Sequence, residues 1–287
     1  YFMRNKVAVL YIVTGRYVCF WDEFYPSCEK YFLPDAQKKY FVFTDAEHLN
    51  FEENDNILKI HQEKLGWPYD TMLRFDIFLK QKEALKEYDY IFFFNANTKF
   101  LNYVREEILP NEENDWLITG SHPAFYNKHP DEFTYDRNPE SQAYIPYGAG
   151  KHYATGALNG GSGASFLEMC EELSRLTHID MDNGVVPLWH DESMLNKYML
   201  NKNPLIMPVN YLYPEERWMP RKWYRNNPFK KDIKILSTDK THPRYGGKEY
   251  LRGISDKKAK MPNPIFSVSY EDAKKVLRIL GFKIRIV

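Results

Sequence analysis

Tyr90-Ile91-Phe92-Phe93-Phe94-Asn95-Ala96-Asn97 is an apolar run that ends abruptly on polar residues. A short, continuously apolar segment of this kind predicts a strand that is buried on both faces, as in a parallel sheet. Ligands bind at the carboxyl ends of the strands in such sheets. Asn95 and Asn97 would stand there two residues apart, so the period of a strand aims both amides to the same side. The alternative is that the two asparagines end the strand in a turn.

Further strand-like runs alternate with helix-like segments on both sides of this stretch. The runs that predict strands are Lys6–Val13, Lys39–Thr44, Asn56–Ile60, Trp116–Thr119 and Pro204–Pro208. The segments with helical periodicity or a helix cap are Val18–Leu33, Asp70–Leu85, Ser165–Leu176, Asp191–Leu200 and Tyr270–Leu280. This alternation predicts an α/β fold with a mostly parallel sheet covered by helices on both faces.

The composition excludes several classes of protein. The 287 residues carry 39 basic and 39 acidic side chains, and this neutral balance argues against a dedicated nucleic-acid binder. The balance is uneven along the chain, with 20 basic and 33 acidic residues before position 217 and 19 basic and 6 acidic residues from there on. No apolar run approaches the ~20 residues that a membrane span needs. No signal peptide is recognisable, although the chain does not begin with Met.

The cysteines and aromatic residues further restrict the classes of protein that fit this sequence. Cys19, Cys28 and Cys170 have neither the number nor the spacing of a disulfide scaffold or a zinc site, which predicts a protein of a reducing compartment. Aromatic residues make up 16% of the chain. Such a surplus fits either a large core or a carbohydrate-binding cleft, where ring faces pack on sugars.

Three polar motifs outside the first stretch could carry chemistry. In Trp189-His190-Asp191-Glu192-Ser193, the indole can stack on a sugar and a carboxylate can stabilise or attack an oxocarbenium-like centre, or else Asp191 and Glu192 simply begin a helix. His122 follows a predicted strand and is either a structural or a ligand-binding residue. Asp180-Met181-Asp182 precedes the turn signal Asn183-Gly184 and is predicted to be a loop rather than a metal site.

Four segments in order resemble glycosyltransferase family 6, which contains the histo-blood-group A and B transferases and the α-1,3-galactosyltransferase. They are Phe133-Thr134-Tyr135, Ser141–Pro146, Asn159–Ser162 and Trp189–Tyr198, and the resemblance extends from about Lys6 to about Tyr250. It implies a GT-A fold, with a Rossmann-like nucleotide-binding half (residues 1–115) and an acceptor-binding half (residues 116–250). We expect residues 251–287 to form a basic extension with a terminal helix. The family transfers galactose or N-acetylgalactosamine from UDP to the 3-hydroxyl of a β-galactoside with retention of the α configuration.

The resemblance also assigns roles to residues. The implied catalytic residue is Glu192, as nucleophile or as electrostatic stabiliser. The implied donor-binding residues are Tyr17, Arg74, Asn95, Asn97, Thr155, Gly156, Ala157, Asp191 and Lys231. The implied acceptor-binding residues are His122, Ala124, Trp189 and Glu192.

The chain departs from the family's metal motif. Asn95 and Asn97 stand where the family usually has the two aspartates of an Asp-x-Asp metal site, as in its bacterial branch. Neutral amides bind Mg²⁺ or Mn²⁺ poorly but can hydrogen-bond ribose or phosphate oxygens. We therefore expect no divalent metal and no cofactor beyond the donor. Basic side chains would then meet the charge on the departing diphosphate, the candidates being Lys230, Lys231, Lys240 and Arg244.

The resemblance thus implies a bacterial, cytoplasmic or peripherally membrane-associated α-1,3-N-acetylgalactosaminyltransferase. The donor it implies is UDP-GalNAc, in agreement with the small Gly156-Ala157 pair that leaves room for an N-acetyl group, and the acceptor it implies is a fucosylated galactoside such as 2′-fucosyllactose. UDP-Gal as donor and a non-catalytic carbohydrate-binding homologue stay open as alternatives. A glycoside hydrolase would need Asp191 and Glu192 to flank one bond, whereas adjacent helical residues point about 100° apart.

Overall fold

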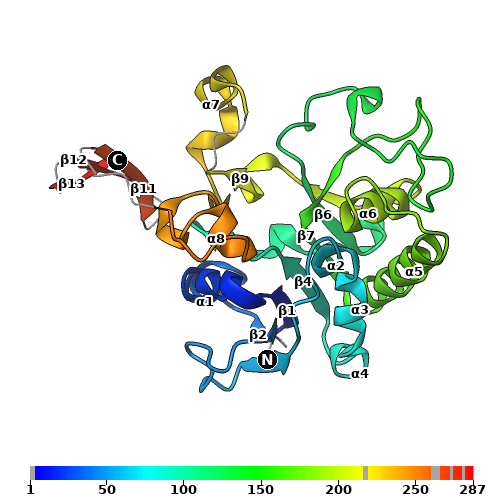
Figure 1. Cartoon of the computed structure of the whole chain (residues 1–287), viewed down its shortest axis with the longest axis horizontal. Helices are drawn as coiled ribbons and strands as arrows, with labels where there is room; N and C mark the ends of the chain where they lie inside the picture. The colour runs from blue at the N-terminus through cyan, green and yellow to red at the C-terminus, as the bar shows by residue number, and fades with distance from the viewer. Residues whose placement is uncertain (1–3, 216–218, 260–265, 272–273, 280–281, 287) are drawn as a thin grey trace. The chain divides into compact units, whose positions relative to one another are not determined.

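The computed structural model of the chain describes residues 4–215, 219–259, 266–271, 274–279 and 282–286 (Figure 1). These residues separate into two units. The first unit comprises residues 4–14, 35–95 and 106–209, and the second comprises residues 15–34, 96–105 and the described residues from 210 onward. Strands from both sides of residue 115 pair in the sheet of the first unit, and the division into a nucleotide-binding and an acceptor-binding half stays a prediction.

Strand β4 (Tyr90–Phe94) is the apolar run identified in the sequence, and it lies in the middle of the sheet of the first unit. In the described part of the chain this sheet has seven strands in the order β3-β2-β1-β4-β7-β6-β8. The other strands are β1 (Lys6–Ile12), β2 (Gln37–Thr44), β3 (Ile57–His61), β6 (Leu117–Ser121), β7 (Ala154–Ser162) and β8 (Leu205–Met207). Strand β7 runs antiparallel to β4 and β6, and the remaining pairs are parallel. The predicted α/β class with a mostly parallel sheet is confirmed, and it is the sheet expected of a GT-A fold.

Helices of the first unit pack on one face of this sheet. They are α2 (Tyr69–Met72), α3 (Arg74–Leu79), α4 (Lys82–Leu85), α5 (Gly163–Asp182) and α6 (Asp191–Met199), with short 3₁₀ turns at Glu106–Ile108, Glu112–Asn114 and Pro130–Glu132. The single helix predicted from Asp70 to Leu85 is interrupted, since the backbone at Leu73 (φ −98°, ψ 19°) and Gln81 (φ −110°, ψ 17°) leaves the helical region.

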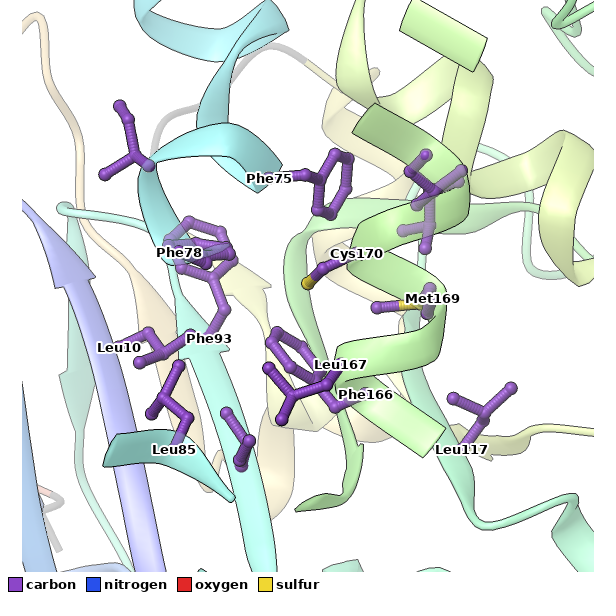
Figure 2. Close-up of a cluster of buried hydrophobic side chains, with 14 of the residues drawn as sticks. Leu10, Phe75, Phe78, Leu85, Phe93, Leu117, Phe166, Leu167, Met169 and Cys170 are labelled. Atoms are coloured by element: carbon purple, nitrogen blue, oxygen red, sulfur yellow. The ribbon is translucent and has the colours of Figure 1, made fainter. Parts of the chain in front are cut away.

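Aromatic side chains fill the space between the sheet and these helices. Figure 2 shows Phe75 and Phe78 of α3 converging with Phe166 of α5 and Phe93 of β4. The Phe78 ring centroid lies 5.3 Å from that of Phe93 and 6.1 Å from that of Phe166. Burial of an aromatic side chain stabilises a fold by about 1.5–3 kcal/mol. Much of the aromatic surplus in the sequence is therefore core, and Cys170 of α5 is buried in the same cluster (Figure 2).

The second unit combines a small sheet with short helices. The sheet has the order β5-β10-β9, from β5 (Thr98–Phe100), β10 (Ile235–Ser237) and β9 (Tyr213–Pro214). The helical segments are η1 (Gly15–Phe20), α1 (Trp21–Tyr31), η5 (Val209–Tyr211, at the unit boundary), α7 (Arg221–Asn226), η6 (Pro228–Lys231), η7 (Pro243–Tyr245) and α8 (Lys248–Arg252). Helix α1 packs on β5 through Phe24, and Phe32 directly after the helix packs there too; their ring centroids lie 6.0 and 5.4 Å from that of Phe100. No helix in the described residues is long and apolar enough to cross a membrane.

The terminal helix predicted at the end of the chain is wrong, because the described residues there form strands. Strands β11 (Phe266–Glu271), β12 (Lys274–Ile279) and β13 (Phe282–Ile286) form an antiparallel sheet there. Residues 272–273 and 280 of the predicted helix lie outside the described residues. In β13 the sequence FKIRI alternates apolar and basic residues, and this two-residue period is the signature of a strand. The helical spacing of Tyr270–Leu280 was therefore misleading, and its described residues belong to β11 and β12.

Candidate active site

The amino-terminal end of α6 presents two carboxylates to the interior of the first unit. Asp191 and Glu192 occupy the first turn of α6, where the helix dipole favours negative charge. The preceding residue, His190, has φ +53° and ψ −120°, a conformation that costs free energy in a residue with a side chain. The Trp189 N–H donates to the Ser193 hydroxyl at 2.9 Å. Local strain at His190 thus sets the angle at which the helix begins.

Asp191 is paired with Arg74, the first residue of α3. Their nearest side-chain oxygen and nitrogen are 2.8 Å apart, and the two side chains are 8% and 7% exposed. The same guanidinium nitrogen donates to the Gly156 carbonyl at 2.6 Å. The guanidinium carbon also lies 4.4 Å from the ring centroid of Phe93 in β4, which makes a cation–π contact. Arg74 therefore links α3, α6, β4 and β7 around one buried charge pair.

Glu192 is held by two hydrogen-bond donors. Its Oε2 accepts from the Gly156 N–H at 2.7 Å, and its Oε1 accepts from the Tyr153 hydroxyl at 2.9 Å. Gly156 is therefore connected to both acidic side chains. Its N–H donates to Glu192, and its carbonyl accepts from the Arg74 guanidinium that pairs with Asp191. Hydrogen bonds that end on a carboxylate are stronger than those between neutral groups.

An irregularity in β7 turns Gly156 toward α6. Thr119 of β6 pairs with Asn159, but the next residue, Gly120, pairs with Thr155. Gly156, Ala157 and Leu158 therefore have no strand-pairing partner on β6, as in a β-bulge that re-aims backbone groups. On the other side of β7, the Ala157 carbonyl accepts from the Asn95 N–H at 2.9 Å. The bulge thus brings together the Thr155-Gly156-Ala157 segment, the end of β4 and the two carboxylates.

Burial sets the ionisation of this site. It raises the pKa of Asp191 to about 7, against the opposing effect of the Arg74 charge. Burial also raises the pKa of Glu192, and the hydrogen bonds from Gly156 and Tyr153 oppose that rise. A carboxyl group whose pKa is shifted by burial beside a specific charge partner is typical of a functional site.

His122 and Ala124 follow β6 and border the same region. The His122 N–H donates to the Tyr153 carbonyl at 3.2 Å, and its Nδ1 accepts from the Ala124 N–H at 3.2 Å. Burial lowers the pKa of His122 to about 4. The imidazole is therefore neutral at physiological pH, as its role as an acceptor at Nδ1 requires.

Exposed aromatic rings lie close to the start of α6. Trp189 is 48% exposed and Trp67 is 68% exposed. The Trp67 ring meets the His190 ring edge-on at 4.6 Å, and the Thr71 hydroxyl lies 3.4 Å from His190 Nδ1. Exposed indoles near the start of α6, which carries both carboxylates, provide faces on which a sugar can stack.

The remaining predicted donor residues belong to the second unit. Tyr17 lies in η1, and Lys230 and Lys231 end η6. The Asn97 amide nitrogen donates to the Thr238 carbonyl at 2.7 Å and to the Ser237 hydroxyl at 3.1 Å, so this side chain holds β5 to the segment that follows β10.

The basic candidates of the second unit differ in their partners. Lys230 donates to the Arg225 carbonyl, and Arg244 pairs with Glu215 at 2.6 Å. Lys240 also has a bonding partner. The exposed Lys231 ammonium has no hydrogen-bond or ion-pair partner among the described residues.

Asn95 and Asn97 offer neutral amide oxygens where Mg²⁺ and Mn²⁺ favour carboxylate oxygens. The amide nitrogen of Asn97 is hydrogen-bonded within the second unit. Among the described residues, no three His, Cys, Asp or Glu side chains are grouped as metal ligands would be.

The literal Asp-x-Asp sequence has a structural role. It lies in the last turn of α5 rather than in the predicted loop. Asp180 is fully buried and accepts from the Ser141 hydroxyl and the Gln142 N–H, both at 2.7 Å. Its carboxylate therefore anchors the Ser141–Pro146 segment to α5.

Sequence reasoning missed residues that only the fold brings to the carboxylates. Tyr153 is 39 positions from Glu192, and no spacing rule connects the two. Asn196 faces β7 from α6 and hydrogen-bonds both backbone groups of Ala154, at 2.8 and 2.9 Å. Trp67 could have been noticed as a Trp that precedes Pro68 between two predicted elements.

Comparison with known proteins agrees with this geometry. Residues 1–244 match the model of glycosyltransferase family 6. The O-antigen biosynthesis glycosyltransferase WbnI of Escherichia coli is 34% identical over 241 residues, which are 84% of this chain and 97% of that protein. The histo-blood group ABO system transferase 2 of Rattus norvegicus is 31% identical over 225 residues, 75% of this chain and 64% of the relative. The globoside alpha-1,3-N-acetylgalactosaminyltransferase 1 of Gallus gallus is 26% identical over 231 residues, 77% of this chain and 64% of the relative.

The chain thus spans nearly the whole of the bacterial relative and just under two thirds of the two vertebrate ones. A mostly parallel α/β sheet, a buried Arg74–Asp191 pair at the start of α6 and a family match over most of the sequence lead to one conclusion. The chain belongs to glycosyltransferase family 6.

Proposed function

We propose that this glycosyltransferase moves N-acetylgalactosamine from UDP-GalNAc to the 3-hydroxyl of a fucosylated β-galactoside, forming an α-1,3 linkage with retention and without a divalent metal. The observation that carries the proposal is the half-buried Glu192 carboxylate, fixed by Gly156 and Tyr153 beside the Arg74–Asp191 pair. A carboxylate fixed in this way can stabilise an anomeric carbon that becomes positive in the transition state.

Glu192 would act as an anion in either route that retains configuration. In double displacement, a Glu192 oxygen bonds to the anomeric carbon while the bond from that carbon to the β-phosphate oxygen breaks and UDP departs with the electron pair. The acceptor 3-oxygen then bonds to the anomeric carbon as the bond to Glu192 breaks, and the hydroxyl proton passes to a base. In same-face transfer, the acceptor bonds on the side that UDP leaves and gives its proton to the departing phosphate. There the Glu192 charge stabilises the oxocarbenium-like centre.

Two further features support the choice of donor. The segment that the family resemblance assigns to the choice between galactose and its 2-acetamido derivative, Thr155-Gly156-Ala157, lies at the bulge of β7 beside Asp191 and Glu192, and its last residue has only a methyl side chain. The Gallus gallus relative is named as an N-acetylgalactosaminyltransferase. Asp191 would accept hydrogen bonds from hydroxyls of the donor sugar, with Arg74 holding the carboxylate in place.

Basic residues of the second unit would replace the charge that a metal supplies in Asp-x-Asp relatives. Phosphoryl leaving groups need positive charge where negative charge develops. Lys231 is the strongest candidate by its chemistry, since its ammonium is exposed and has no partner in the described part of the chain.

The test is a transfer assay that varies donor and acceptor independently. UDP-GalNAc and UDP-Gal are each offered to 2′-fucosyllactose and to lactose, and the products are identified by mass spectrometry and by NMR of the new linkage. We expect an α-linked N-acetylgalactosamine on the fucosylated acceptor. Glu192→Gln, which removes the charge but keeps the shape, is expected to lose at least about a hundredfold in turnover, in the range seen when a main electrostatic contact is removed.

Each other outcome replaces the proposal with a named alternative. Faster transfer from UDP-Gal would make the protein a galactosyltransferase. Acceptor binding without turnover of either donor would make it a carbohydrate-binding homologue. Release of free sugar from simple glycosides in the absence of a UDP-sugar would identify a glycoside hydrolase. Wild-type turnover by Glu192→Gln would show that Glu192 is not the catalytic residue.

A further inference from the structure

Tyr153 lies immediately before β7 in a cluster of aromatic rings. Its side chain is 4% exposed. Its ring centroid lies 4.6 Å from that of Phe125 and 5.8 Å from that of Phe133, and the Tyr135 ring stacks on it at 5.5 Å with an angle of 15°. Close packing on several sides leaves the phenol few alternative rotamers. The position of its hydroxyl is therefore set by the cluster.

The Tyr153 hydroxyl is a donor to Glu192. It donates to Oε1 at 2.9 Å and lies 3.3 Å from the Thr134 hydroxyl, which donates to it. A phenol has one proton to give, and here it goes to the carboxylate. Burial raises the pKa of Tyr153 far above its usual range, so the hydroxyl keeps that proton at any pH suited to catalysis.

We propose that Tyr153 is a positioning residue for Glu192. Its hydroxyl holds Oε1 while the Gly156 N–H holds Oε2, so the carboxylate plane is fixed and its charged form is favoured. The inference rests on the proposed function, because it assigns to Tyr153 the orientation of the residue that faces the anomeric carbon. A group held by two directed donors has a geometry that a loosely packed carboxylate would lack.

In the described part of the chain, the other ionisable groups beside Glu192 or against the Tyr153 ring are Arg74, Asp191, His122, His190 and Tyr135. Arg74 is bonded to Asp191 and to the Gly156 carbonyl, and Asp191 precedes Glu192 on the same helix. Burial lowers the pKa of both histidines. Tyr135 donates its proton to the His152 carbonyl at 2.6 Å. Among the described residues, only Tyr153 and Gly156 donate hydrogen bonds to the Glu192 carboxylate.

The pH profile of turnover separates positioning from general stability. Tyr153→Phe removes a donor that favours the ionised carboxylate, so Glu192 would take up its proton at a higher pH. We expect kcat to fall at least about tenfold and the acid limb of the kcat profile to move up by about one pH unit, which corresponds to one hydrogen bond to a charged group. The KM for the donor should change much less than kcat.

Tyr135→Phe is the matched control. It removes a buried tyrosine hydroxyl from the same aromatic cluster, but one that donates to a backbone carbonyl rather than to Glu192. It should keep the wild-type acid limb. Site-specific 3-fluorotyrosine at position 153 preserves the packing and makes the phenol a stronger donor, so it should move the acid limb to lower pH. If Tyr153→Phe folds poorly, the shift of the acid limb in the 3-fluorotyrosine variant tests the positioning role.

Different results would refute the proposed function and the positioning role of Tyr153. A wild-type protein that transfers no sugar would refute the proposed function. A wild-type protein that transfers sugar, with an acid limb unmoved by both changes at position 153, would refute the positioning role alone. A limb that moves equally in Tyr135→Phe would show a general effect of the cluster and would also overturn the inference.

Discussion

Gly156 leaves no room for a side chain beside the two carboxylates. A Cβ there would lie 3.0 Å from Asp191 Oδ2 and 3.2 Å from the Glu192 Cβ. Gly156→Ala is therefore expected to push α6 away from β7 and to lower the unfolding free energy by about 1–3 kcal/mol, as overpacking does. Transfer should fall at least about tenfold because the Glu192 carboxylate moves. Urea unfolding and initial rates measure the two effects, and a fully active variant would contradict the geometry.

His122 should make stability depend on pH in the acid range. Its pKa is lowered to about 4 in the folded protein by burial, whereas an unfolded chain has the ordinary value near 6.5. The unfolded state therefore binds more protons between these values, so the contribution of His122 is fully present above about pH 6.5 and is lost as the pH falls toward 4.

His122→Gln removes this dependence. The difference in unfolding free energy between wild type and variant should shrink by at least about 1 kcal/mol from pH 7 to pH 4.5, on the scale of 1.36 kcal/mol per pKa unit. Chemical denaturation at several pH values measures it. His48→Gln, at an exposed position, is the matched control. A difference that stays constant with pH would contradict the burial of a neutral His122.

At the scale of elements, Asn196 holds α6 against β7. Its Oδ1 accepts from the Ala154 N–H, and its amide nitrogen donates to the Ala154 and Glu192 carbonyls at 2.9 and 2.8 Å. Asn196→Ala would leave buried backbone groups of Ala154 unpaired, at a cost of about 1–3 kcal/mol for each unpaired group. Because Glu192 is carried on α6, we expect kcat to fall together with stability.

Asn201→Ala is the control for this prediction, since Asn201 is exposed just beyond the end of α6. It should leave both unfolding and turnover within experimental error. If Asn196→Ala lost stability but kept the wild-type kcat, the hydrogen bonds of Asn196 would stabilise the fold without contributing to catalysis. The measurements are thermal or urea unfolding and the initial rate at saturating donor.

Periodicity predicted the existence of most elements but not their ends or their irregularities. The apolar run of β4 specified a buried strand without reference to the rest of the chain. The bulge at Gly156–Leu158 was not predictable, because it arises from how β7 pairs with β6 rather than from the sequence of β7. The terminal segment was misread for a related reason: a short run can satisfy a helical and a strand period, and pairing with neighbouring strands decides between them.

At the scale of the whole molecule, positive charge is concentrated in the last quarter of the sequence. Residues from 217 onward carry 19 basic and 6 acidic side chains, against 20 and 33 in the rest of the chain. With amides at positions 95 and 97, we expect transfer to persist in excess EDTA. Lys231→Gln should lower kcat/KM for the donor at least about tenfold, by removing a charge from the diphosphate.

The control for the charge effect is Lys222→Gln, which removes an exposed lysine of α7 from the same unit. It should change kcat/KM by less than about twofold if the effect of Lys231 is specific, because a general effect of the unit's net charge is screened by salt. Loss of transfer in EDTA, with rescue by Mn²⁺, would refute the metal-free proposal. Equal effects of the two lysine variants would remove Lys231 from its proposed role.

The sequence by itself determined the fold class, the family and the identity of the acidic residues. These depend on local patterns: an apolar run that stops at Asn95, and the long Trp189–Tyr198 motif. Only the tertiary structure decided what surrounds those residues. Arg74, Tyr153 and Gly156 are far from Glu192 in the chain and reach it or its neighbour Asp191 through the packing of α3 and β7 against α6. Burial and directed hydrogen bonds shift the ionisation of a carboxyl group, and both are properties of the packed fold rather than of any segment.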